Sequence, residues 1–178
     1  MMIGSGDDRL LFLRYALPCA STLVKRGNVT REYIEGLVEQ VSRRKPPEED
    51  AEKLFKVANV MCDSVAERMH KQSTDAEVIR RYFLFEHSKV VDDRFELMKD
   101  FSPVDCRTYA GKVVRLADGN ATVETILGQM EYRNPFVSDA KVGDDVVVHF
   151  DFVVEKLATE VAREKRVLDE KERRGKVQ

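Results

Sequence analysis

Two side chains of this chain, Cys106 and His149, have the clearest capacity to bind a metal. A thiolate is a soft ligand and an imidazole a borderline one, and both suit first-row transition metals such as iron. The chain has three cysteines at wide spacing and no Cys-x-x-Cys motif, which excludes a disulfide framework and a zinc ribbon. Cys106 could therefore act as a metal ligand if the fold brings a second suitable side chain, such as that of His149, close to it, and it could otherwise be a small packed residue.

The other cysteines and histidines read as structural residues. Cys19 and Cys62 lie in segments with helical periodicity, where a buried free thiol is expected. His87 follows Glu86, and adjacent side chains on a helix point about 100° apart, so these two cannot readily share a ligand. His70 lies at a predicted helix end, where the helix dipole favours a cation. The sequence predicts no functional role for these residues.

Composition narrows the class of protein. The 178 residues include 30 basic and 32 acidic side chains, and this lack of basic excess argues against a nucleic-acid binder. No apolar stretch approaches the ~20 residues of a membrane helix. Asp7 and Asp8 stand where a signal peptide carries positive charge, so we expect a cytoplasmic protein. No phosphate loop, nucleophile elbow or His-Glu-x-x-His motif is present, and we expect no enzyme activity.

The first hundred residues show helical periodicity and predict a bundle with short loops and antiparallel neighbours. Pro18 lies inside the first helical pattern and should kink or divide it. We expect about four helices, over 8–26, from about 30 to before Pro46, over 47–69, and from Thr74 to about Val90.

From Cys106 the apolar pattern changes to a period of two, which predicts strands. Asp118 and Gly119 are suited to a tight hairpin turn. In the last predicted strand, "DVVVHFDFVVEKL", His149 falls with Asp151 on the face opposite to the core. Four to five short strands in about fifty residues indicate a small closed or half-open barrel of the OB type.

The change of period places a domain boundary near residue 102. We predict a helical domain over 1–102, a β-barrel domain over 103–157, and a charged C-terminal helix or tail over 158–178. Val161, Val167 and Leu168 form a thin apolar seam on that helix. The mixed charges favour a solvated helix docked along one edge, and a partner-binding helix is the alternative.

Residues 106–157 resemble the HypC/HupF family of hydrogenase-assembly chaperones. The resemblance rests on Cys106, on Gly111-Lys112-Val113, on Lys141-Val142-Gly143-Asp144, and on His149. It implies that Cys106 is the thiolate ligand of an iron centre carrying diatomic ligands, and that His149 is its second ligand or its proton partner. It also implies protein partners, namely a HypD-like maturation factor or a hydrogenase large-subunit precursor. The chain departs from the family at Asp105, since a peptide bond engages the amine that the family's terminal cysteine leaves free.

The sequence therefore predicts an α+β protein with an N-terminal helical bundle, a small HypC-like β-barrel of the OB type and a C-terminal helix. The predicted function is a non-catalytic chaperone for hydrogenase maturation or metal-cofactor assembly. Two alternatives are a protein-interaction scaffold without metal and an OB-type nucleic-acid-binding module. The side chains available for the second alternative are Arg107, Tyr109, Arg115, Tyr132 and Arg133.

Overall fold

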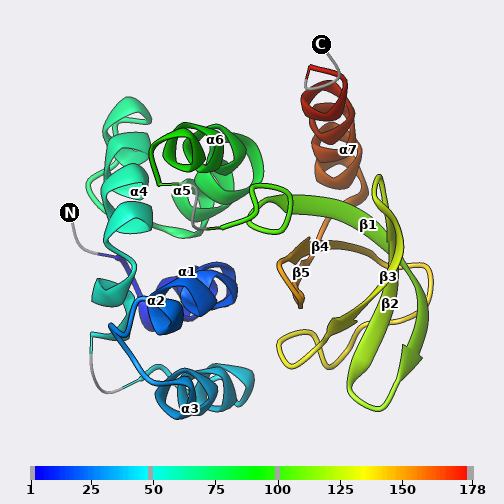
Figure 1. The fold of residues 1–178 in the computed structure, drawn as a ribbon, viewed down its shortest axis with the longest axis horizontal. Coiled ribbons are helices and arrows are strands. Elements are labelled where there is room, and N and C mark those ends of the chain that lie inside the picture. The colour runs from blue at the N-terminus through cyan, green and yellow to red at the C-terminus, as the bar shows by residue number, and fades with distance from the viewer. Residues whose placement is uncertain (1–2, 48–49, 99–100, 176–178) are drawn as a thin grey trace. The chain divides into compact units, whose positions relative to one another are not determined.

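The computed structural model describes residues 3–47, 50–98 and 101–175 and confirms the predicted α+β class (Figure 1). The chain divides into two compact units, unit 1 at Met1–Phe101 and unit 2 at Ser102–Gln178, and each is described by itself. The predicted ranges 1–102, 103–157 and 158–178 stay a prediction, and residues 176–178 of the predicted tail lie outside the described residues. Across the described ranges, no helix has both the length and the apolar character needed to cross a membrane.

Unit 1 is helical, in agreement with the predicted bundle. Pro18 lies in a short 3-10 turn that divides the predicted first helix in two. Glu48 and Glu49, at the start of the predicted helix over 47–69, lie outside the described residues. The elements are α1 (Gly6–Ala16), η1 (Leu17–Cys19), α2 (Ala20–Lys25), α3 (Arg31–Ser42), η2 (Ala51–Leu54), α4 (Lys56–Arg68), α5 (Ala76–Arg81), η3 (Tyr82–Glu86) and α6 (His87–Met98).

The core of unit 1 forms around α1, which contacts α3, α5 and η2. Tyr15 stacks on Phe83 with ring centroids 4.9 Å apart. Phe12 meets the edges of Phe55 and Phe83 at 6.5 and 6.0 Å. Edge-to-face and offset pairs of this kind stabilise a core beyond the apolar area that they bury. Phe12, Tyr15, Tyr82 and Phe83 are therefore core residues.

The described part of unit 2 contains a closed barrel of five strands, which the alternating pattern predicted. Its strand order is β1-β2-β3-β5-β4, and all pairs are antiparallel except β3 with β5. Asp118 and Gly119, with φ of 50° and 78°, form the predicted turn between β1 and β2. The strands are β1 (Thr108–Ala117), β2 (Asn120–Thr125), β3 (Gly128–Arg133), β4 (Asp145–His149) and β5 (Phe152–Lys156).

The predicted last strand is wrong in one respect, because the chain reverses within it. β4 ends at His149 and β5 begins at Phe152, with Phe150 and Asp151 in the turn. The pleat therefore does not continue through His149, and the predicted alternation of faces fails. His149 is fully buried instead of lying on a face opposite to the core.

The C-terminal helix α7 (Thr159–Arg174) packs on β1 and β4 along an edge that matches the predicted apolar seam only in part, since Val161 and Leu168 are half-buried. Val167 is 49% exposed, whereas Lys165 and Asp169 are buried. The residues of the docked face, Ala162, Lys165 and Asp169, recur at helical spacing. The edge that docks is therefore centred on a charged pair, which the sequence alone would assign to solvent.

That charged pair is satisfied by the first strand of the barrel. The Lys165 ammonium donates to the carbonyl of Thr108 at 2.8 Å and forms an ion pair with Asp169. Asp169 also accepts the backbone N–H of Ala110 at 3.0 Å. Burial raises the pKa of Asp169 above its usual value, and Lys165 opposes this shift. The pair thus fixes α7 to β1 through groups that would be costly to leave unpaired.

We expect Asp169→Ala to destabilise unit 2 by about 3–5 kcal/mol, because the Lys165 charge would stay buried without its counter-charge. Urea unfolding of the full chain, followed by circular dichroism, measures the effect. The double variant Lys165→Met/Asp169→Leu removes both charges and should lose less stability than Asp169→Ala. If Asp169→Ala were as stable as the wild type, the ion pair would not contribute to the docking of α7.

Gly111 lies where β1 approaches β2 too closely for a side chain. A Cβ there would lie 2.5 Å from Val123 Cγ1 and 2.7 Å from the backbone oxygen of Glu124. We expect Gly111→Ala to cost about 1–3 kcal/mol through overpacking. Gly36→Ala in α3 is the matched control, since a Cβ there meets nothing within 4 Å and should stabilise the helix by about 0.5–1 kcal/mol. Equal unfolding midpoints for the two variants would contradict this reading.

Candidate metal centre

The pairing of β1 with β4 brings Cys106 and His149 together. Thr108, at the start of β1, lies opposite His149, at the end of β4. Cys106 precedes Thr108 by two residues and therefore lies at the same edge of the barrel as His149. The two residues are 43 positions apart in the sequence. Cys106 and His149 are therefore close together because the first strand and the strand that ends at the histidine are neighbours in the barrel.

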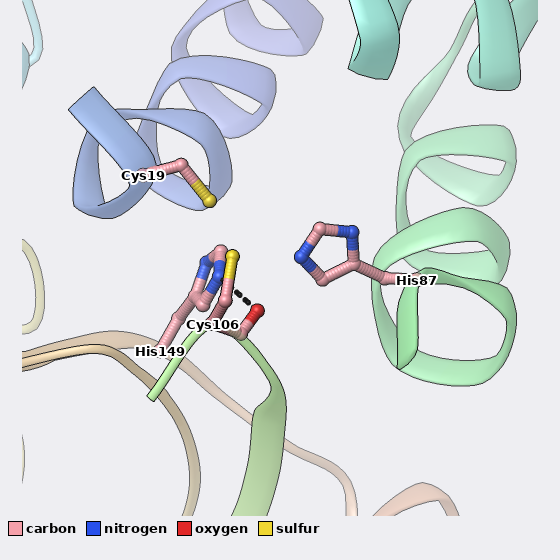
Figure 2. A group of neighbouring side chains, drawn as sticks. All are labelled: Cys19, His87, Cys106 and His149. Atoms are coloured by element: carbon pink, nitrogen blue, oxygen red, sulfur yellow. Dashed lines mark hydrogen bonds between the residues drawn. The ribbon is translucent and has the colours of Figure 1, made fainter. Parts of the chain in front are cut away.

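Two hydrogen bonds join the end of β4 to the segment before β1. His149 Nε2 lies 3.0 Å from the carbonyl oxygen of Cys106. The dashed line in Figure 2 marks this hydrogen bond. The N–H of Phe150 donates to the carbonyl of Asp105 at 3.2 Å. Because a carbonyl oxygen can only accept, the first bond assigns the proton of a neutral His149 to Nε2 and the lone pair to Nδ1. A metal-binding histidine is typically oriented in this way.

The donor set fits a transition metal. The Cys106 sulfur and a ring nitrogen of His149 lie within 4.8 Å of each other. Metal–sulfur and metal–nitrogen bonds of about 2.3 and 2.0–2.1 Å place the two ligand atoms about 3.5 Å apart in a tetrahedral site, so an inward movement of the side chains by up to about 1.3 Å lets both atoms reach one ion. Cys106 is 7% exposed and His149 fully buried. These side chains are therefore able to hold a metal ion in a site with little water.

The backbone of Cys106 does not contribute a ligand. Its N–H donates to the carbonyl of Ser102 at 3.1 Å, within the turn that leads into β1. The N–H of the peptide bond between Asp105 and Cys106 thus stabilises this turn. Coordination by this residue is limited to the thiolate.

The turn after His149 has an unusual backbone. Phe150 has a φ of 51°, a region that bulky side chains rarely adopt. Such a residue costs about 1–3 kcal/mol and persists only where its surroundings hold it. Here the hydrogen bond from Phe150 to Asp105 and the pairing of His149 with Phe152 hold the turn. The reversal ends β4 at His149 and keeps the imidazole beside Cys106.

The remaining cysteines differ from each other. Cys62 is a buried free thiol, as predicted, and burial raises its pKa well above the usual range. Cys19 is half-buried and lies within 4.8 Å of a ring nitrogen of His87 in the same unit. The sequence alone suggested only Glu86 as a possible co-ligand of His87, and it gave no sign that Cys19 lies near this histidine. Only the tertiary fold of unit 1 brings that pair together.

The aromatic side chains proposed for nucleic-acid stacking are buried. Tyr109 donates its hydroxyl to the carbonyl of Val104, and burial raises the pKa of Tyr109 to about 12. Tyr132 is also buried, and the Arg133 guanidinium lies over the Phe152 ring at 4.6 Å. These rings pack within unit 2 and do not form a stacking platform on its surface.

No protein-family model matches this chain, and no curated protein matches it as a relative. The fold and the site define a helical unit followed by a five-stranded barrel with a cysteine and a histidine at one edge. The chemistry of those side chains is therefore the basis for the function proposed below.

We expect His149→Ala to destabilise the chain by at least about 1–3 kcal/mol, since the buried carbonyl of Cys106 loses its donor. His149→Gln should lose less, because the glutamine amide nitrogen can replace Nε2 as a donor. The measurement is the urea midpoint of each variant without metal. Equal losses in the two variants would show that the bond to Cys106 does not contribute to stability.

Proposed function

We propose that this chain is a non-catalytic, HypC-like assembly factor that holds an iron centre through the Cys106 thiolate and Nδ1 of His149. The observation that carries the proposal is the His149 Nε2–Cys106 carbonyl hydrogen bond, which orients the imidazole beside the thiol. A thiolate and an imidazole are suitable ligands for iron. Bound in this way, the iron would carry the chemistry, and the barrel would bind, orient and shield it from water.

The barrel gives further support. Five strands in the order β1-β2-β3-β5-β4, with β1 joined to β4, are compatible with an OB-type barrel. Gly111 of the family-like Gly-Lys-Val segment occupies the close approach between β1 and β2. Lys112 donates to the carbonyl of Gly143 and pairs with Asp145, which joins both family-like segments. The residues that carry the resemblance therefore lie along the β1–β4 pair, with Cys106 and His149 near one end and Gly111, Lys112 and Asp145 at the other.

The proposed partners follow from the resemblance. They are a HypD-like maturation factor, which would exchange the iron centre with this chain, and a hydrogenase large-subunit precursor, which would receive it. A site formed by two protein ligands suits such an exchange, because its other coordination positions remain for ligands supplied by a partner.

Two alternative functions have less support. A metal-free scaffold would need neither the thiol nor the orientation of His149. A nucleic-acid module would need exposed aromatic rings, and Tyr109 and Tyr132 are buried. The exposed Val167 on α7 is a single apolar residue and does not define a docking surface.

The test is anaerobic purification of the full chain as wild type, Cys106→Ala and His149→Gln, followed by metal analysis and infrared spectroscopy. We expect iron with cyanide or carbonyl bands in the wild type and its loss in both variants. His149→Gln retains the structural donor and removes the ligand nitrogen, so its loss of iron would report coordination.

Cys62→Ser is the matched control, because Cys62 is a buried cysteine whose raised pKa disfavours the thiolate. It should keep the iron content of the wild type. Iron retained in Cys106→Ala would contradict the proposal. Absence of iron from every preparation, with partner capture unaffected by Cys106→Ala, would favour the scaffold.

A further inference from the structure

We propose that Cys19 and His87 of unit 1 are also metal ligands, for a borderline divalent ion of the class of Zn²⁺, Co²⁺ or Fe²⁺. The sequence assigns both residues to the helical core. The inference rests on the structure of unit 1 and does not depend on the function proposed for Cys106 and His149.

The first observation is the meeting of two unlike ligands. Cys19 ends the η1 turn that Pro18 creates after α1, and His87 is the first residue of α6. The Cys19 sulfur and a ring nitrogen of His87 lie within 4.8 Å, and a tetrahedral ion would draw them to about 3.5 Å. Cys19 therefore lies at the point where Pro18 interrupts the α-helical hydrogen bonding of the first helical segment.

The second observation is the π-helical turn that precedes His87. In η3 (Tyr82–Glu86) the N–H of His87 donates to the carbonyl of Tyr82, five residues earlier. π-Helical turns are rare and frequently lie at functional sites. The wider turn aligns the side chains of Tyr82 and His87, and His87 Nδ1 lies 3.1 Å from the Tyr82 hydroxyl.

The third observation is the fixed orientation of the His87 ring. It lies 5.4 Å from the rings of both Tyr82 and Phe83 and is 7% exposed. Figure 2 shows it extending away from its own helix. When Nδ1–H donates to the Tyr82 hydroxyl, the lone pair is on Nε2. A hydrogen bond from the second ring nitrogen is the usual support of a metal-binding histidine.

Binding follows simple chemistry. The Cys19 thiol releases its proton to solvent as sulfur binds the ion, and neutral His87 donates the Nε2 lone pair. Affinity should therefore rise with pH. Cys19 and His87 supply two ligands, and other groups complete the coordination of the ion.

The test is an anaerobic titration of the metal-free full chain with Co²⁺, whose sulfur-to-cobalt charge-transfer absorption reports thiolate coordination. We expect Cys19→Ser to lose part of this absorption and His87→Gln to weaken binding. Tyr82→Phe keeps both ligands and removes the supporting hydroxyl, so its apparent Kd for Co²⁺ should rise by about 10–100-fold. The matched controls, Cys62→Ser and His70→Asn, should titrate as the wild type does.

Alkylation of the wild-type chain provides a second measurement. It uses no variant, so a folding defect cannot explain its result. Zn²⁺ should protect Cys19 from iodoacetamide, as measured by mass spectrometry of the peptide that contains it. Cobalt absorption unchanged in Cys19→Ser, or Cys19 alkylated equally with and without Zn²⁺, would overturn the inference. If Cys106→Ser lost the absorption and Cys19→Ser did not, the proposed function of Cys106 and His149 would stand, and the inference about Cys19 and His87 would be contradicted.

Discussion

The pairing of β1 with β4 is the contact on which the rest of unit 2 depends. It closes the barrel, and its register places Thr108 opposite His149. The same end of β1 supplies the Thr108 carbonyl to Lys165 and the Ala110 N–H to Asp169. A shift of one residue would exchange the faces of β1 and break these contacts together. The register of this one strand pair thus determines both the proximity of Cys106 to His149 and the docking of α7.

Buried polar groups in both units are placed by specific hydrogen bonds rather than by burial alone. His149 donates to a backbone carbonyl, and His87 lies in hydrogen-bond contact with the Tyr82 hydroxyl. In each case one ring nitrogen has a structural partner, which selects the nitrogen that can act as a ligand. Lys165 and Asp169 follow the same rule, because their charges are tolerated in the interior through each other and through β1.

Local irregularities occur next to the candidate ligands. Pro18 interrupts the first helical segment immediately before Cys19, and a π-helical turn ends immediately before His87. Phe150, with its positive φ, follows His149. Each of these deviates from a regular helix or strand and changes the direction of a side chain or of the chain itself. Their positions are consistent with the tendency of such features to gather at functional sites.

The sequence by itself determined the element types, because periods of 3.6 and 2 residues record which faces are buried. It also predicted the break at Pro18, the Asp118-Gly119 turn and Cys106 with His149 as candidate ligands. It could not predict the reversal at Phe150, since the run from Asp145 to Lys156 satisfies the pattern of one strand. It also assigned Lys165 and Asp169 to solvent and overlooked Cys19 with His87. Those outcomes depend on contacts between residues distant in sequence, and only tertiary packing brings their hydrogen-bonding and ligand atoms together.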